Sequence, residues 1–313
     1  MLRKTLFDSH THINNDTYTE EEREQLIADI ESSDVAYVMD IGFDLPSSEQ
    51  AVRDAARLSW CYAAVGVHPH DTKTMNEDIY ERIRQLAGQP KVQAIGEIGL
   101  DFYYNHSDAE EQRYWFRRQI RLANELHMPI VIHSREADQE TMDILKEEGA
   151  FSAERCSWFP QRPGTGIGRE GGVAEASAAC GAVAVNTAAG ENAGTCDAEC
   201  CMEKDARVLL HCFSGSRELA MQYVKLGATL SIAGPVTYKN NRKTSEVVSA
   251  IPIEYLLVET DAPYLTPEPY RGKKNKSPYV EHTARRVALL KSLPYEEVAR
   301  RTLENAKRFY GIE

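Results

Sequence analysis

The sequence contains no long apolar run and no surplus of positive charge. No stretch approaches the ~20 consecutive apolar residues that a membrane-spanning helix needs. Residues 1–6 lead directly into a predicted strand, without the apolar core and cleavage site of a signal peptide. We therefore expect a cytoplasmic protein with no membrane partner. The formal net charge of −12 disfavours a protein that coats DNA or RNA, but it is compatible with an enzyme that captures a phosphate group locally.

Cysteine is scarce outside one segment. Five of the seven cysteines lie within residues 151–205, so they do not supply a disulfide framework for the whole fold. Cys196, Cys200 and Cys201 could bind a soft metal, but no second pair follows at the distance of a zinc finger, and a loop with reduced thiols is favoured. The segment is rich in Gly and Ala and lacks hydrophobic periodicity. Because such long structureless stretches are uncommon inside compact domains, we predict a poorly ordered, low-complexity insertion.

The rest of the chain alternates short, β-rich apolar runs with longer amphipathic segments. The eight predicted strands cover residues 5–9, 35–41, 61–67, 92–96, 129–132, 208–210, 228–232 and 256–259. Several are almost continuously apolar, which is typical of parallel strands buried on both faces. Without the insertion, the length is close to the ~250 residues of a single barrel.

This alternation predicts an α/β fold, a (β/α)8 TIM-type barrel that spans residues 1–313 as one domain. A doubly wound open sheet is the alternative, although no G-x-G-x-x-G motif follows the first strand. The insertion falls between the fifth helix and the sixth strand. Helix-to-strand connections lie on the face opposite the catalytic loops, so we expect residues 151–205 to leave the active site uncovered.

Metal-binding residue types recur where the predicted strands end. His10 and His12 follow the first strand, and residues two apart on an extended chain point to the same side. The same pattern, an apolar run that ends in His, Glu or Asp, recurs at the fourth, fifth, sixth and eighth strands with Glu97, His133, His211 and Asp261. Since the carboxyl ends of barrel strands meet at one mouth, four imidazoles and two carboxylates are expected there. This donor set suits divalent metals.

The motifs around these residues resemble those of the TatD-type metal-dependent deoxyribonucleases, within the amidohydrolase-like barrels. The resemblance rests on FDSHTH (7–12), GVHPH (66–70), GEIGLD (96–101), IHSR (132–135), HCFSG (211–215) and ETDAPYL (259–265). These motifs occur in the family's order and at its spacings, and the resemblance covers residues 3–150 and 206–312. The segment 151–205 departs from the family's pattern but leaves every motif intact.

The resemblance implies two divalent metal ions, which could be Mg, Mn or Zn. One ion would be held by His10, His12 and Asp261, and Glu97 would bridge to the second. His133 and His211 would complete the second site. Glu97 and Asp261 are the implied catalytic residues, with Asp261 orienting or deprotonating the attacking water. A two-metal site can polarise a phosphoryl group and activate water in this way.

Four further residues are predicted to bind substrate. The resemblance places His68 near the mouth without making it a metal ligand, and Arg135 follows His133 by two residues. Arg271 and Lys273 belong to the main basic cluster, residues 270–276, which follows the eighth strand. The structural alternatives are a hydrogen-bonded loop histidine for His68, a surface ion pair for Arg135 and a solvated loop for residues 270–276.

We therefore predict a metal-dependent hydrolase that cleaves the phosphodiester bonds of DNA, as an exonuclease acting on ends or single strands without an obligate protein partner. Fold and ligands alone do not separate this from a metal-dependent amide or ester hydrolase of the deacylase kind. Arg135 and the basic cluster favour a phosphate substrate. A non-enzymatic metal-binding scaffold, whose insertion recruits a partner, is the third interpretation.

Overall fold

A computed structural model describes residues 4–163 and 202–313, and its eight main strands form one parallel sheet. In sheet order they are β1 (Leu6–Thr11), β2 (Val35–Ile41), β3 (Cys61–Val65), β4 (Val92–Asp101), β5 (Ile130–Arg135), β8 (Val208–Leu210), β9 (Thr229–Ile232) and β10 (Leu256–Val258). The backbone amide of His12 donates to Ala262 O and that of Asp261 donates to His10 O, both at 2.9 Å. These bonds join the last strand's end to the first. The predicted barrel is confirmed, and the open doubly wound sheet is excluded.

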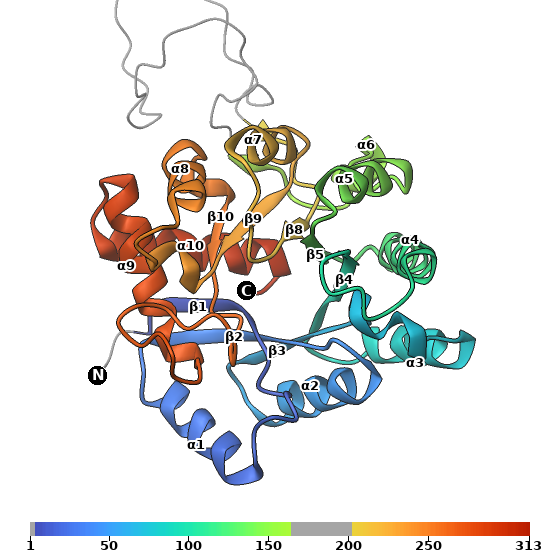
Figure 1. Cartoon of the computed structure of the whole chain (residues 1–313), viewed down its shortest axis with the longest axis horizontal. Helices are drawn as coiled ribbons and strands as arrows, with labels where there is room; N and C mark the ends of the chain where they lie inside the picture. The colour runs from blue at the N-terminus through green and yellow to red at the C-terminus, as the bar shows by residue number, and fades with distance from the viewer. Residues whose placement is uncertain (1–3, 164–201) are drawn as a thin grey trace, which may run out of the picture.

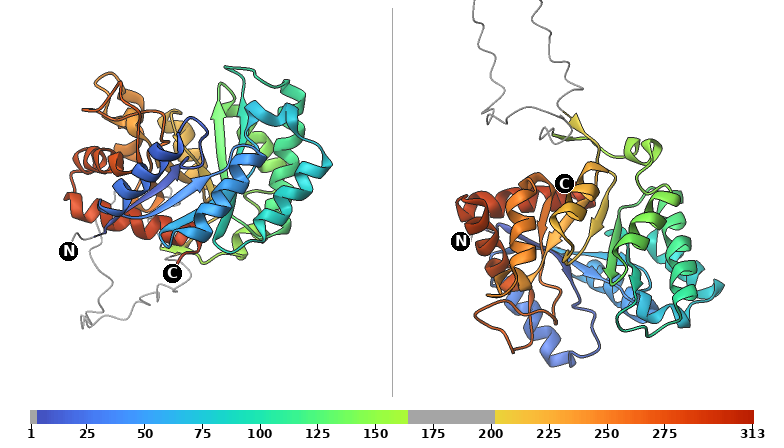
Figure 2. Two further views of the ribbon diagram at one scale, coloured as in Figure 1. Left: turned by 90° about the horizontal axis from the view of Figure 1, so that it is seen from below. Right: turned by 45° about the horizontal axis from the view of Figure 1, so that its top comes forward.

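The helices lie outside the strands, as Figures 1 and 2 show. They are α1 (Glu20–Glu31), α2 (Leu45–Arg57), α3 (Glu77–Ala87), α4 (Ala109–Glu125), α5 (Asp138–Glu147), α6 (Ala153–Ser157), α7 (Arg217–Lys225), α8 (Arg242–Ala250), α9 (Val280–Lys291) and α10 (Tyr295–Tyr310). Local sequence fixes their starts: Thr19 and Glu22 form a reciprocal capping box at α1. Among the described helices, none is long and apolar enough to span a membrane.

The interior of the barrel is a packed apolar core that is closed at one end. Inward-facing side chains from successive strands, such as Phe7, Met39 and Val131, pack with Phe309 and Tyr310 at the end of α10. The hydroxyl of Tyr310 donates to the backbone oxygen of Ser9 at 2.9 Å. α10 therefore covers the end of the barrel where the strands begin. We call this end the base, and the end where the strands finish the mouth.

The borders of the predicted insertion belong to the folded structure. Residues 151–163 include α6, and β6 (Arg162–Pro163) pairs antiparallel with β7 (Met202–Glu203). The fully buried Arg155 of α6 donates to the backbone oxygens of Ala206 and Met128 at 2.9 and 2.8 Å. Residues 151–163 and 202–205, which the predicted insertion includes, are therefore folded and not poorly ordered, because contacts distant in sequence hold the two flanks.

The same contacts locate the connection in the barrel. Ala206 lies two residues before β8, and its amide donates to the backbone oxygen of Gly227, two residues before β9. The folded flanks therefore lie at the base, as predicted from the helix-to-strand connection. Residues 164–201 lie outside the described residues. The prediction that this part of the insertion is disordered therefore concerns residues that the structure does not describe.

Candidate metal centre

An irregularity in β4 positions Glu97. The predicted fourth strand ends before this residue, whereas β4 continues to Asp101, so Glu97 lies within the strand. Between Ile95 and Ile98 the pairing with β5 shifts by one residue, as in a β-bulge. Such a bulge bends a strand and redirects a side chain. Glu97 is thereby buried among the histidines of the mouth.

Gly99 allows β4 and β5 to approach closely beside this bulge. A Cβ atom on Gly99 would lie only 1.9 Å from the backbone oxygen of His133, and the φ angle of Gly99 is +151°. Any side chain here would push the two strands apart. The second glycine of the GEIGLD motif therefore has a steric role, since it lets Glu97 and His133 face the same site.

Four side chains, from the end of β1 and the next residue, from β4 and from the segment after β10, form a first group of ligand atoms. His10 Nε2 lies 3.3 Å from His12 Nε2, 3.7 Å from Asp261 Oδ1 and 3.3 Å from Glu97 Oε2. His12 Nε2 lies 3.4 Å from Asp261 Oδ1. A tetrahedral site with bonds of about 2.1 Å has ligand atoms about 3.4 Å apart. The donor atoms are therefore spaced as a single bound cation requires.

The other carboxylate oxygen of Glu97 faces a second group. Glu97 Oε1 lies 2.6 Å from His211 Nε2, 2.9 Å from His133 Nδ1 and 3.5 Å from His68 Nε2. Glu97 thus directs one oxygen toward each group. The structure brings together all six residues predicted as metal ligands, with His68 beside them, near the mouth as predicted.

Outer hydrogen bonds orient the imidazole rings. His12 Nδ1 donates to the backbone oxygen of Ile41 at 2.8 Å, and His133 Nε2 donates to Asp101 Oδ2 at 3.2 Å. A proton on the outer nitrogen leaves the lone pair of the inner nitrogen directed at the centre. Histidine ligands of protein metal sites are typically fixed in this way.

The carboxylates of the centre are held in their ionised form. Burial opposes the charge of Glu97, but the neighbouring imidazoles, above all His211, outweigh it and hold the pKa of Glu97 well below its usual range. Burial likewise opposes the charge of Asp261, and its contact with His12 helps to keep the pKa of Asp261 low. Buried anionic oxygens among imidazole nitrogens are a donor set for a divalent cation. The residues therefore fit the metal that the sequence predicted.

His68 differs from the predicted ligands in its hydrogen bonding. Its Nδ1 accepts from the His70 amide at 3.1 Å, so the neutral ring carries its proton on Nε2, next to Glu97. Burial and the neighbouring His133 lower the pKa of His68 well below its usual value. A buried neutral imidazole of this kind is a hydrogen-bond donor at the mouth.

The predicted basic residues lie around the mouth but outside the ligand cluster. The guanidinium of Arg135, at the end of β5, lies over the rings of Tyr103 and Tyr104, 4.2 and 4.5 Å from their centroids. Arg271 lies over Tyr238. In the part of the chain that the structure describes, neither arginine forms an ion pair with a carboxylate.

The predicted basic cluster divides into two pairs of cations. Lys274 and Lys276 are ion-paired with Glu22 and Asp29 of α1. Lys273 lies 5.5 Å from the ring centroid of Tyr270 and, among the described residues, has no carboxylate within ion-pair distance. Lys274 and Lys276 therefore anchor the loop, and Arg271 and Lys273 are its cations available to a substrate.

Two buried glutamines of α4 support the site and were not predicted from the sequence. The Gln112 side chain accepts from the Asp101 amide at 2.9 Å and donates to the Asp101 carbonyl at 3.1 Å. Gln119 makes the corresponding pair with the backbone of Val67. Both glutamines interrupt the apolar face of α4, seven positions apart. This interruption is the sequence signal that could have identified them.

Comparisons with known proteins agree with this geometry. The profile of the family described as TatD related DNase matches residues 7–158 and 192–311. An uncharacterized metal-dependent hydrolase, YabD of Bacillus subtilis, is 36% identical over 98% of this chain and 99% of its own. The 3'-5' ssDNA/RNA exonuclease TatD of Klebsiella pneumoniae is 29% identical, with 98% of each chain covered. The crystal structure of the TatD homologue YJJV of Escherichia coli superposes with a TM-score of 0.76 at 21% identity, covering both chains completely.

Proposed function

This chain belongs to the TatD-related DNase family of metal-dependent hydrolases, and we propose that it is a two-metal exonuclease that cleaves phosphodiester bonds at the ends of single-stranded DNA. The observation that carries the proposal is the bridging position of Glu97. Its two oxygens face separate groups of histidine nitrogens, with His10 on one side and His133 and His211 on the other.

The proposal assigns one ion to His10, His12 and Asp261 and a second to His133 and His211, with Glu97 shared. Bound ions would neutralise the phosphate charge and lower the pKa of a water molecule. The proposed ligands do not select one metal, because His and carboxylate ligands suit several divalent metals.

Asp261 acts in this proposal as the base that orients the attacking water and takes its proton. Its side chain is 14% exposed, against 0% for His10 and 4% for Glu97, so it borders the space that a substrate enters. His68 Nε2 is suited to donate a hydrogen bond to a phosphate oxygen. Arg135, Arg271 and Lys273 are assigned to the flanking phosphates, where they offset the negative charge of the protein.

The substrate and polarity rest on the relatives and on the charge of the surface. The TatD relative of Klebsiella pneumoniae carries the name 3'-5' ssDNA/RNA exonuclease, which supports attack from a 3' end. A net charge of −12 favours capture of a strand end by a few local cations over contact along a duplex.

The test is digestion of a single strand labelled at either its 5' or its 3' end, with Mg or Mn added. Attack from the 3' end should release the 3' label at once as a mononucleotide and shorten the 5'-labelled strand to a ladder. His10→Ala, Asp261→Asn and chelation by EDTA should each abolish release. Metal binding should be only partly lost in Asp261→Asn, because the other three ligands of this group, His10, His12 and Glu97, stay in place.

Wild-type protein that binds metal but leaves DNA intact would overturn the proposal. Amide and ester substrates would then be tested on the same centre. Near-normal turnover in Asp261→Asn would contradict the role given to this carboxylate.

A further inference from the structure

Exposed aromatic side chains gather at the mouth of the barrel. Tyr103 and Tyr104, in the loop after β4, are 58% and 50% exposed, and Tyr264, in the loop after β10, is also exposed. Most large apolar side chains of the described residues are buried, so two adjacent solvent-facing tyrosines are unusual in this protein. At least half of the surface of Tyr103 and of Tyr104 is therefore open to solvent.

The two tyrosines form one unit with a cation. The ring centroids of Tyr103 and Tyr104 are 4.9 Å apart, and the Arg135 guanidinium lies over both rings. Tyr104 also stacks on His106, with nearly parallel rings and centroids 5.6 Å apart. We call Tyr103, Tyr104 and Arg135 the aromatic platform. It presents two exposed rings beside a cation that, among the described residues, has no carboxylate partner.

A single carboxylate ties the platform to the metal centre. Asp101 Oδ1 accepts hydrogen bonds from the amides of Tyr103 and Tyr104, both at 3.0 Å. Its Oδ2 accepts from His133 Nε2 at 3.2 Å and from His70 Nε2 at 2.8 Å. Arg135 also follows His133 by two residues on β5, so their Cα atoms are about 7 Å apart. The platform is therefore held at a fixed position beside the ligands.

We propose that the aromatic platform stacks unpaired nucleobases next to the bond being cleaved, so that Tyr103, Tyr104 and Arg135 determine a preference for unpaired ends. This inference rests on the proposed nuclease function. Bases stack on tyrosine rings and on arginine planes irrespective of sequence, and each base contributes substantially to binding. A base inside a duplex has both faces covered by its neighbours, so the platform discriminates against paired ends.

The test compares substrates with and without bases. One single strand carries normal thymidines at its 3' end, and a second carries three abasic tetrahydrofuran residues there, with the same phosphates. The variants are Tyr103→Ala/Tyr104→Ala, the ring-retaining Tyr103→Phe/Tyr104→Phe, and Tyr114→Ala as control. Tyr114, on the outer face of α4, is 51% exposed and also lies beside an arginine, Arg118.

The double alanine variant should raise KM for the thymidine end by roughly 10- to 100-fold, with little change in kcat. Its kcat/KM for the abasic end should equal that of the wild type. The double phenylalanine variant should behave as wild type, because the rings and not the hydroxyls carry the stacking, and Tyr114→Ala should have no effect. Equal losses on both substrates, or an unaffected thymidine end, would overturn the proposal.

Failure of the nuclease function is distinguishable from failure of the platform. If the wild type cleaves neither strand, the proposed function fails, and binding of a fluorescent oligothymidylate measured by anisotropy still tests the platform. Weaker binding by the double alanine variant than by Tyr114→Ala would support it. Equal affinity of these two variants would overturn it.

Discussion

The two ends of the barrel use buried polar residues in opposite ways. At the mouth, imidazole nitrogens and carboxylate oxygens point at one another, and the outer nitrogens of His12 and His133 are bound to Ile41 O and Asp101. At the base, arginines direct their donors into backbone oxygens and into the buried carboxylate of Asp205. Unused lone pairs can bind a cation, whereas satisfied donors only join segments of the chain.

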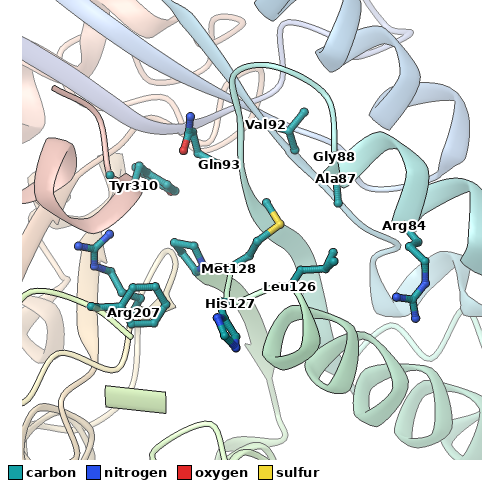
Figure 3. A pocket seen from close by; sticks show the side chains of 13 residues that line it. Arg84, Ala87, Gly88, Val92, Gln93, Leu126, His127, Met128, Arg207 and Tyr310 are labelled. Atoms are coloured by element: carbon teal, nitrogen blue, oxygen red, sulfur yellow. The ribbon is translucent and has the colours of Figure 1, made fainter. Parts of the chain in front are cut away.

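The volume of a cavity does not by itself mark the functional end of the barrel. The base contains a cavity of about 430 Å³ next to the first residues of β4 and β5, lined by Arg84, Met128, Arg207 and Tyr310 among others (Figure 3). Its arginines are already engaged: Arg84 pairs with Glu125, and Arg207 donates to Phe309 O at 2.7 Å. Convergent ligand atoms, and not volume, distinguish the site. The comparison predicts that changes at the mouth alter activity and changes at the base alter stability.

The largest expected effect is that of Glu97→Gln. The amide keeps the size of the side chain but supplies one neutral oxygen in place of two charged ones, so it cannot bridge both ligand groups. We expect kcat/KM to fall by about 10³-fold or more. The protein should stay folded with a somewhat lower unfolding midpoint, because the histidines lose the carboxylate charge that they stabilise. Activity assays and thermal unfolding of the same preparation measure both. Loss of folding in this variant would contradict the prediction that changes at the mouth alter activity and not stability.

Asp101→Asn should have a smaller effect at the mouth. The variant weakens the hydrogen bond that orients His133, and such outer partners typically contribute 10- to 100-fold in metal affinity or activity. We expect losses within about that range in metal affinity, measured by titration, and in kcat. Unchanged metal affinity would show that the contact between Asp101 and His133 does not orient the ligand.

At the base, Arg155→Met should destabilise the fold without altering the chemistry. It leaves the buried backbone oxygens of Met128 and Ala206 without their donors, which we expect to cost about 3 kcal/mol of unfolding free energy. Denaturant unfolding gives this value, and kcat per folded molecule should stay at the wild-type level. Arg300→Met, which removes exposed ion pairs on α10, is the matched control and should leave the unfolding midpoint near that of the wild type.

The smallest effect is expected when residues 164–201 are replaced by an Asn-Gly turn. Pro163 pairs with Met202 in the antiparallel β6–β7 ladder, so a two-residue connection suits the ends that are joined. Activity and the unfolding midpoint should stay close to wild type. A deletion extended to residues 153–203 removes Arg155 and Arg162 and should unfold the protein. Equal behaviour of the two deletions would contradict the role given to the folded flanks.

The sequence predicted the strands and the gathering of His, Glu and Asp side chains at the mouth well, because both depend on local signals. Apolar runs revealed all eight strands, and His10, His12 and Asp261 directly follow or end such runs. Glu97 was assigned to the end of its strand because the bulge depends on pairing with β5, which no local pattern encodes. The order of the two flanks, residues 151–163 and 202–205, was missed for a similar reason: Arg155 and Arg162 bind Ala206 and Thr229, which lie far along the chain.

The most direct test of the account is the number of metal ions bound per chain by the wild type, His12→Ala and His133→Ala. Each protein is equilibrated with Zn or Mn, freed of excess ion by gel filtration and analysed by mass spectrometry of the metal. The bridging position of Glu97 predicts two ions in the wild type and one in each variant. One ion in the wild type, or two in either variant, would contradict the division of the mouth into two sites that share Glu97.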